Sequence, residues 1–203
     1  MIALDLLPPE LLRRRAFLVG FVGGLLAALL GALVSLLVDP VAGLVLFLLL
    51  SLPPSLFSFA EARKRTWLDG RVLTVRGLGT TSADLGAVTD LGVLVSQAKG
   101  LRTVNLLISA GGRTLSVGLA IYADDRMREL EPLALRKLAD ALIATGEPYA
   151  LLFAELLVAQ LRADAREASL EERPLFTLAA VAEPGRLAQR IGSDVVSKVV
   201  ARD

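Results

Sequence analysis

Two long apolar runs near the start of the chain constrain its fold more than any other feature. The first, Ala16 to Val38, has 23 residues without a charge, and the second, Val41 to Phe59, has 19. As α-helices they would measure about 34 Å and about 28 Å, against a hydrocarbon core of roughly 30 Å. Only Asp39 and Pro40 separate the runs, so the pattern predicts a transmembrane hairpin of helices over about 16–38 and 41–60.

Basic residues flank both outer ends of the runs, while the connection between them has none. Such residues beside membrane-spanning helices stay in the cytoplasm, so we expect a multi-pass protein of the cell (inner) membrane with both termini cytoplasmic. The same residues and the only tryptophan would contact membrane lipids, although the tryptophan would serve equally well in the core of the hairpin that follows. This membrane-surface set is Arg13, Arg14, Arg15, Arg63, Lys64, Arg65 and Trp67.

A secretory signal peptide is the alternative interpretation of the first run. Its basic start fits, but the apolar part of a signal is about 7–15 residues long and a cleavage site follows it. Here a second apolar run follows at once, which favours the hairpin.

Small residues recur at every fourth position of the first run, in two adjacent ridges. Such ridges let helices approach closely in lipid, so we expect one set to pack against another helix. That helix is either the second of the hairpin or one from another subunit, which would give a homo-oligomer. The helix-packing set is Gly20, Gly24, Ala28 and Gly31. In the second run, Pro53-Pro54 predict a kink or break, with Ser51 capping a restarted helix.

The pattern changes to short alternating segments after Arg65. They predict six antiparallel strands separated by turns, followed by a helix that begins at Pro132 and ends before Gly146. Residues 66–146 should therefore form a small antiparallel β domain capped by a helix. The expected strands are 66–68, 71–76, 81–85, 91–98, 101–109 and 113–120.

Residues 147–203 are predicted to be a C-terminal helical extension. An apolar stripe at helical spacing crosses residues 148–168 and needs cover from the β domain, the bilayer surface or another protein. We expect part of it to bind a partner protein, through Leu152, Phe153, Leu156 and Leu157. Beyond it, 174–182 is expected to be extended and 184–202 to form a weaker amphipathic helix.

The stretches TWLDGRVLTVRG (66–77) and SADLGAVTDLGVLV (82–95) resemble the opening hairpins of pleckstrin-homology-like (PH-like) domains. With two N-terminal membrane helices, the plan resembles bacterial membrane proteins that carry such a domain. The resemblance implies an α+β membrane protein with a PH-like domain over 66–146, but it transfers no activity, because function resides in a site. Arginine outnumbers lysine 18 to 4, which indicates a GC-rich bacterial source, such as an actinobacterium.

The composition excludes several kinds of chemistry. The chain has no cysteine and no histidine, which removes disulfides, thiolate metal sites and the Ser-His and Cys-His nucleophiles. The densest acidic group, Asp124 and Asp125 with Glu129 and Glu131, could bind a divalent cation, but acids also favour a helix start. We expect no metal, cofactor or catalytic residue. A net charge of +1 argues against nucleic-acid partners.

We therefore expect a non-catalytic, membrane-anchored scaffold or accessory subunit. Its cytoplasmic PH-like domain and C-terminal helices would bind a partner protein or a larger membrane complex. The alternative is a lipid-binding or lipid-sensing module that holds a chain or headgroup in a cavity between sheet and helix, opening toward Trp67. An enzyme that uses carboxylates alone is the third possibility, but no nucleophile and base stand at an informative spacing.

Overall fold

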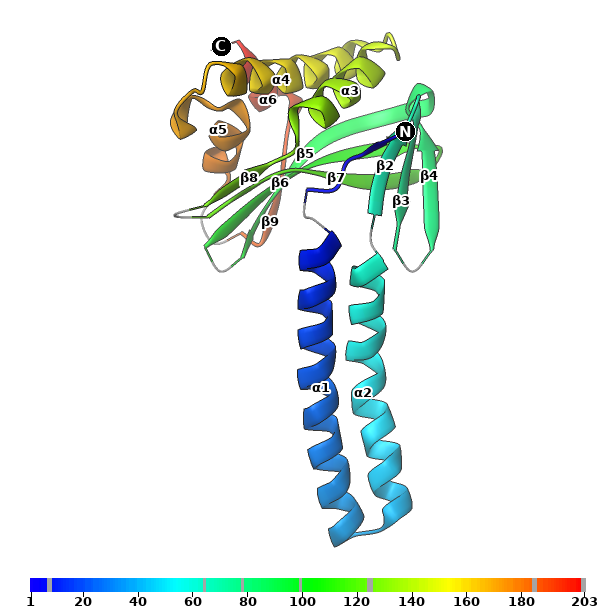
Figure 1. Ribbon diagram of the computed structural model, residues 1–203. Helices are drawn as coiled ribbons and strands as arrows, with labels where there is room; N and C mark the ends of the chain where they lie inside the picture. Colours follow the sequence, from blue (N-terminus) through cyan, green and yellow to red (C-terminus); the bar gives the residue numbers. More distant parts are fainter. Residues whose placement is uncertain are drawn as a thin grey trace. The chain divides into compact units, whose positions relative to one another are not determined.

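The structure, a computed structural model, describes most of the chain. The described residues are 1–6, 9–63, 65–77, 79–98, 100–123, 126–183 and 186–201, without the side chains of 9–16, 55, 57 and 59–62. The chain divides into two compact units (Figure 1). The α+β unit comprises Met1–Leu6, Arg65–Val75 and Thr81–Asp203, and the helical unit comprises Leu7–Lys64 and Arg76–Thr80.

The helical unit contains the two predicted helices as an antiparallel pair, α1 (Pro9–Leu37) and α2 (Pro40–Arg63). Asp39 ends the connection between them, and its carboxylate accepts hydrogen bonds from the backbone N–H groups of Val41 (3.0 Å) and Ala42 (3.2 Å). These bonds satisfy donors that a helix start leaves unpaired, and Pro40 fits the first helical position because it has no N–H to lose. The Asp-Pro pair therefore starts α2 sharply.

The prediction of a break at Pro53-Pro54 is wrong, because α2 continues as one helix through both prolines. The Ser51 hydroxyl does not cap a new helix but donates back to the Leu48 carbonyl at 3.5 Å. Gly23 of α1 gives Pro54 room, since a Cβ at Gly23 would lie only 3.1 Å from the proline ring.

The two helices approach closely at Gly31 and Gly43. A Cβ at Gly31 would lie 2.9 Å from the Gly43 carbonyl oxygen and from Cβ of Phe47, which is closer than real Cβ atoms come. Only glycine at these positions lets the backbones meet at this separation, and small residues allow the same close approach between helices of membrane proteins.

The predicted helix-packing set divides between two faces of α1. Gly20 faces α2, with Ser58 Oγ 3.4 Å from the place of a Cβ, and Gly31 packs on α2 as described. Gly24 has no neighbour within 4 Å of that place, and Ala28 is exposed. Of the predicted set, Gly20 and Gly31 therefore face α2, while Gly24 and Ala28 do not, and packing of these two on a helix of another subunit stays a prediction.

One helix in the described part of the chain is long and apolar enough to cross a membrane, over Phe17–Leu37. Only 11% of its most apolar window is buried. The apolar stretch found in α2, Pro40–Pro54, is shorter.

Gly31→Leu is expected to push the two helices apart by about 2 Å, because the new side chain has no space beside Gly43. Spin labels on cysteines at the exposed positions Val22 and Leu52 would report the separation in detergent micelles. Gly24→Leu is the matched control, since it points away from α2. An unchanged distance in Gly31→Leu would contradict this packing.

The first sheet of the α+β unit pairs four strands in the order β1-β2-β3-β4. These are β1 (Ile2–Ala3), β2 (Arg65–Asp69), β3 (Val72–Arg76) and β4 (Thr80–Asp84). Gly70 turns the chain between β2 and β3 at φ 59°, a backbone conformation that glycine adopts without strain.

Strand β1 is missing from the sequence prediction. It pairs antiparallel with β2, with Ile2 opposite Leu68 and Ala3 opposite Trp67. Two further bonds extend the pairing, from the Leu4 N–H to the Thr66 carbonyl (2.8 Å) and from the Thr66 N–H to the Asp5 carboxylate (2.7 Å). The chain before the helical hairpin and the chain after it are therefore neighbours in one sheet.

The second sheet has five antiparallel strands in the order β8-β7-β6-β5-β9. Three of them, β5 (Val88–Ala98), β6 (Leu101–Ala110) and β7 (Arg113–Tyr122), form the predicted meander. The other two, β8 (Met127–Glu129) and β9 (Ala188–Ile191), were not predicted. All six expected strands are thus present, and the C-terminal part of the chain adds one edge of this sheet.

Four helices lie together on one face of the second sheet (Figure 1). They are α3 (Pro132–Ile143), α4 (Pro148–Ala165), α5 (Pro174–Val181) and α6 (Ser193–Val200); short 3₁₀ turns lie at Leu85–Ala87 and Leu170–Glu172. Residues 147–203 are therefore part of the α+β unit rather than a separate extension. Within them, 174–182 is helical rather than extended, and 184–202 yields β9 and α6 rather than one helix.

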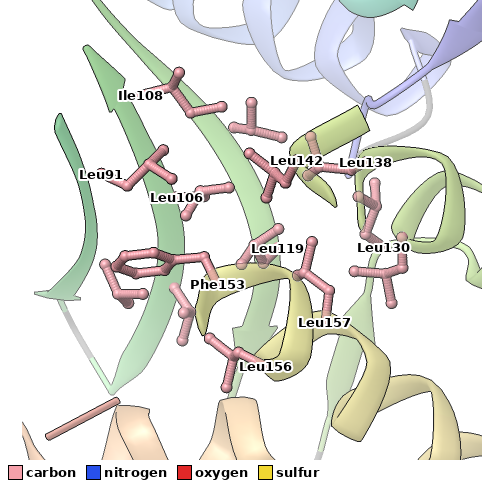
Figure 2. Packing of buried hydrophobic residues seen from close by; sticks show 14 of the residues in the cluster. Leu91, Leu106, Ile108, Leu119, Leu130, Leu138, Leu142, Phe153, Leu156 and Leu157 are labelled. Atoms are coloured by element: carbon pink, nitrogen blue, oxygen red, sulfur yellow. The ribbon is translucent and has the colours of Figure 1, made fainter. Parts of the chain in front are cut away.

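Figure 2 shows how α3 and α4 pack on the sheet through leucines and one phenylalanine. Phe153, Leu156 and Leu157 of α4 are at most 1% exposed, and Leu152 is half-buried against the same cluster. All four residues were predicted to bind a partner protein. The structure corrects this for Phe153, Leu156 and Leu157, because the chain's own sheet and helices cover them, and Leu152 is partly covered in the same way.

Candidate functional site

A groove of about 530 Å³ lies at one end of the second sheet. The sheet contributes the ends of β5, β6 and β7, and the opposite wall comes from the Leu170 turn, α5 and the segment before β9. All of these segments belong to the α+β unit. Its lining residues are Gln97, Ala98, Gly100, Leu101, Arg102, Tyr122, Ala123, Leu170, Phe176, Arg186 and Leu187.

The register of β6 and β7 places Arg102 directly opposite Tyr122. Alternate β6 residues beyond Arg102, beginning with Val104 and Leu106, are buried in the core, so Arg102 lies on the helix-covered face of the sheet. Arg102 is half-buried, and no carboxylate forms an ion pair with it among the residues that the structure describes. The groove thus presents one uncompensated guanidinium beside an aromatic ring.

Tyr122 forms a wall of the groove with its ring. The ring meets Phe176 edge to face, with centroids 5.2 Å apart, and the hydroxyl donates to Glu129 Oε1 at 2.7 Å. Burial, followed by the charge of Glu129 and this hydrogen bond, raises the pKa of Tyr122 well above its usual range. Tyr122 therefore stays neutral and acts as an apolar surface rather than an acid or a base.

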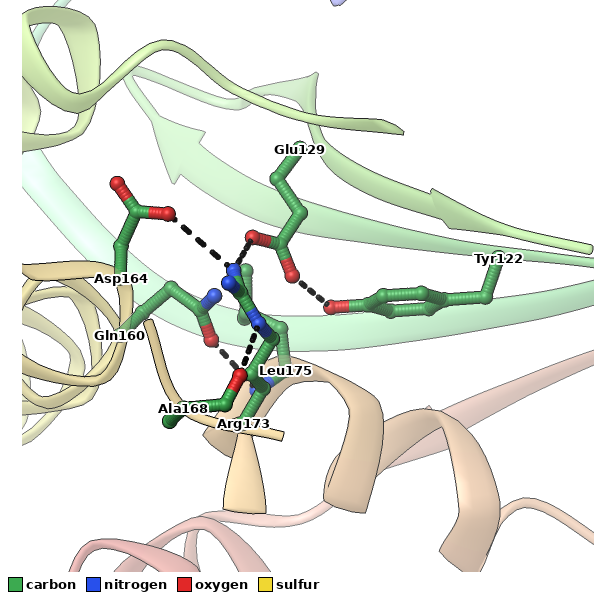
Figure 3. Close-up of polar contacts among 7 residues, drawn as sticks. All are labelled: Tyr122, Glu129, Gln160, Asp164, Ala168, Arg173 and Leu175. Atoms are coloured by element: carbon green, nitrogen blue, oxygen red, sulfur yellow. Dashed lines mark hydrogen bonds and ion pairs between the residues drawn. The ribbon is translucent and has the colours of Figure 1, made fainter. Parts of the chain in front are cut away.

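Behind Tyr122 lies a buried polar cluster centred on Arg173 (Figure 3). The Arg173 side chain is 7% exposed; its Nη1 lies 2.5 Å from Glu129 and 3.3 Å from Asp164, and its Nε donates to the Ala168 carbonyl at 3.3 Å. These contacts join β8, α4 and the start of α5. Because every charge in it has a partner, the cluster is suited to holding these elements in place.

Gln160 of α4 stands beside the arginine cluster (Figure 3). Its side-chain oxygen accepts the backbone N–H of Leu175 at 3.1 Å, which satisfies a donor in the first turn of α5. Its amide nitrogen is buried without a hydrogen-bond partner in the described structure. Gln160 therefore positions α5, and with it the Phe176 wall of the groove.

The described members of the predicted membrane-surface set lie where the chain passes from α2 into β2. Arg63 ends α2 and Arg65 begins β2, and both are exposed, while Trp67 is half-buried in β2. The side chains of Arg13, Arg14 and Arg15, and the whole of Lys64, lie outside the described residues. Trp67 does not line the groove, so the predicted lipid cavity opening toward Trp67 is not this one.

Of the acidic group considered as a cation site, only Glu129 and Glu131 lie in the described part of the chain. Glu129 is committed to Arg173 and Tyr122, and Asp124 and Asp125 lie outside the described residues. No cluster of three or more acidic residues suited to a metal occurs in the part of the chain that the structure describes. The described polar side chains of the groove are Gln97, Arg102, Tyr122 and Arg186, which include no nucleophile beside a base.

Comparisons with protein-family models, curated proteins and solved structures find no match to this chain.

Sequence reasoning did not identify Arg102, Tyr122, Phe176 or Arg173 as site residues. One signal was present, because pairing the two strands outward from the Gly111-Gly112 turn brings residue 102 close to residue 122. The position of Phe176 carried no such signal, since it depends on α5, a segment that was expected to be extended.

Proposed function

We propose that the protein is a non-catalytic, membrane-anchored module. The hairpin of α1 and α2 spans the inner membrane of a bacterial cell twice, and the α+β unit lies in the cytoplasm as an interaction platform for a partner protein or membrane complex. The proposal rests on one observation. The chain leaves the first sheet after β1, forms the apolar hairpin of α1 and α2, and returns to the same sheet at β2. The order of strands and capping helix from 66 to 146 supports a PH-like domain.

The exposure of α1 supports insertion in a membrane. Its outward side chains are large and apolar, such as Phe21 (60% exposed), Leu29 (62%) and Leu33 (52%). In water, a continuous apolar surface of this kind favours aggregation. In lipid, it is the surface expected of a membrane-spanning helix. A core helix of a soluble protein would bury these residues instead.

The pairing of β1 with β2 supports two crossings rather than one. The chain leaves the sheet after Leu6 and returns to it at Arg65, so both ends of the hairpin lie on the same side of any membrane. The number of crossings between them must then be even. For the second crossing, the uncharged sequence of α2 continues from Pro54 to Ala60. A cleaved signal sequence would separate β1 from β2 and is disfavoured on the same ground.

A partner would bind surfaces of the α+β unit other than the apolar stripe of α4, which is buried. Deleting residues 147–203 would remove buried core residues and the β9 edge of the sheet, so it would unfold the unit rather than test docking. Exposed apolar residues on the helix layer, including Leu133 (60%), Ile143 (49%) and Leu151 (38%), remain open to a partner or a second copy.

The topology can be tested with single cysteines, since the chain has none of its own. In intact cells, a membrane-impermeant maleimide is expected to label Val38→Cys, in the connection between the helices, and not Lys137→Cys, an exposed position on α3. Detergent permeabilisation should make both positions reactive, because it opens the cytoplasmic side to the reagent.

Two outcomes would overturn the proposed topology. Labelling of Lys137→Cys in intact cells would place the α+β unit outside, as a single span or a secreted form requires. Labelling of Val38→Cys only after permeabilisation would mean that the hairpin does not cross. Membrane fractions washed with alkaline carbonate provide the independent check that the protein is integral.

A further inference from the structure

We propose that the groove beside Tyr122 binds the headgroup and the first acyl carbons of one anionic phospholipid. The lipid phosphate would pair with Arg102, and the acyl chain would lie along Leu101, Phe176 and Leu187. This inference deepens the proposed membrane function, and its test in detergent solution needs no membrane crossing, so either can fail without the other.

The size and position of the groove suit part of a lipid rather than a whole one. Its volume of about 530 Å³ lies within the usual range of small-molecule sites, roughly 300–1,000 Å³. It lies at the end of the sheet, where Leu101 and Leu187 stand at the rim, so the rest of the lipid's acyl chain can extend away from the protein. Buried hydrophobic side chains pack between the sheet and the helices in the region that Figure 2 draws.

The charge of the groove favours an anion. Arg102 is partly desolvated and lacks a carboxylate partner among the described residues, and a planar guanidinium in that state binds phosphate through two parallel hydrogen bonds. A second guanidinium, Arg186, stands at the rim, but its Nε is held 2.8 Å from Glu183. Arg102 is therefore the residue that selects the headgroup.

Its apolar walls favour an acyl chain over a free anion. Leu187 is 80% exposed and Leu101 43%, a costly state for leucines at the mouth of a groove. Deeper in, Phe176 packs on the Tyr122 ring, and that ring presents no charge because its hydroxyl is bound to Glu129. An acyl chain covers these surfaces, which inorganic phosphate or a soluble phosphoester would leave in water.

Native mass spectrometry of the full chain in a neutral maltoside detergent can count bound lipids directly. The probes are hexanoyl phosphatidylglycerol and hexanoyl phosphatidylcholine, which share their tails and differ in net charge. One phosphatidylglycerol per chain is expected to bind at least about tenfold more tightly than the choline lipid. Arg102→Gln should remove this preference, while Leu187→Ser should weaken both lipids alike.

Arg113→Gln is the matched control, because Arg113 lies exposed at the opposite end of β7 and outside the groove. It should keep the preference, and the near-native fluorescence of Trp67 should show that every variant is folded. Equal binding of the two lipids, or equal loss in Arg113→Gln and Arg102→Gln, would overturn the proposal. Displacement by glycerol phosphate at the same concentration as the lipid would instead identify a site for soluble phosphates, and capture of an acidic peptide in place of lipid would identify a protein site.

Discussion

Phe153→Ala is expected to lower the free energy of unfolding of the α+β unit by about 3–5 kcal/mol. Phe153 is 1% exposed and lies between α4 and the second sheet, so its removal leaves a cavity that close-packed neighbours fill only in part (Figure 2). Urea titration of the full chain in maltoside micelles measures the change. The fluorescence of Trp67, the only tryptophan, reports it from within the same unit.

Leu151→Ala provides the comparison for Phe153, because Leu151 is a neighbour on the same helix but is 38% exposed. Its expected cost is below about 1 kcal/mol, as for most partly exposed positions. Equal costs for the two variants would contradict the packing of α4. The contrast also distinguishes a core residue from a docking residue, because substituting a docking residue would weaken partner binding without lowering the free energy of unfolding.

Arg173→Met is expected to destabilise the same unit by about 3–5 kcal/mol. The change removes the only positive charge from the buried cluster of Figure 3 and leaves the Glu129 carboxylate, 12% exposed, without its ion-pair partner. The cost comes from that stranded charge more than from the lost attraction. The same urea titration measures it.

Two further variants identify the source of that cost. Adding Glu129→Gln to Arg173→Met should recover part of the stability, because a neutral amide needs no counter-ion and still accepts the Tyr122 hydroxyl. Arg186→Met, which breaks an ion pair exposed on both sides, should cost less than about 1 kcal/mol. A double variant no more stable than Arg173→Met would show that packing of the arginine stem, and not charge, is what matters.

The elements that sequence predicted well are those whose signal is local. Alternation and turn glycines located the meander of β5, β6 and β7, and Pro132 and Gly146 bracketed α3. The apolar length of α1 was equally explicit, as were the Asp39-Pro40 turn and the ridge carrying Gly31. In each case the residues that determine the structure lie within about one turn or hairpin of one another.

The elements that were missed depend on contacts between distant parts of the chain. Strand β1 is two residues long and exists through its pairing with Trp67 and Leu68. Strand β9 pairs with β5, and its Arg190 guanidinium also donates to Asp90 at 2.5 Å across about a hundred residues of chain. The residue pattern within a four-residue strand carries no information about a contact with a residue so far away in the sequence.

The same limit explains the main error about the candidate site. The stripe containing Phe153 was correctly identified as needing cover, but its spacing is identical whether the cover is a sheet or another protein. The β5–β7 meander covers this stripe, and only the tertiary structure shows that contact. The groove itself is composed from six segments, so no single stretch of sequence indicates it.

The adjacency of β1 and β2 also fixes an order of events during synthesis. At roughly 5–20 residues per second, a ribosome delivers β2 several seconds after β1, with both apolar helices emerging in between. In the topology proposed above, β1 has no partner strand until α2 has brought the chain back to the side of the membrane where α1 began, and Leu4 until then has no core to enter. In that topology, completion of the sheet acts as a proofreading step, because a chain that has inserted only one helix cannot pair β1 with β2.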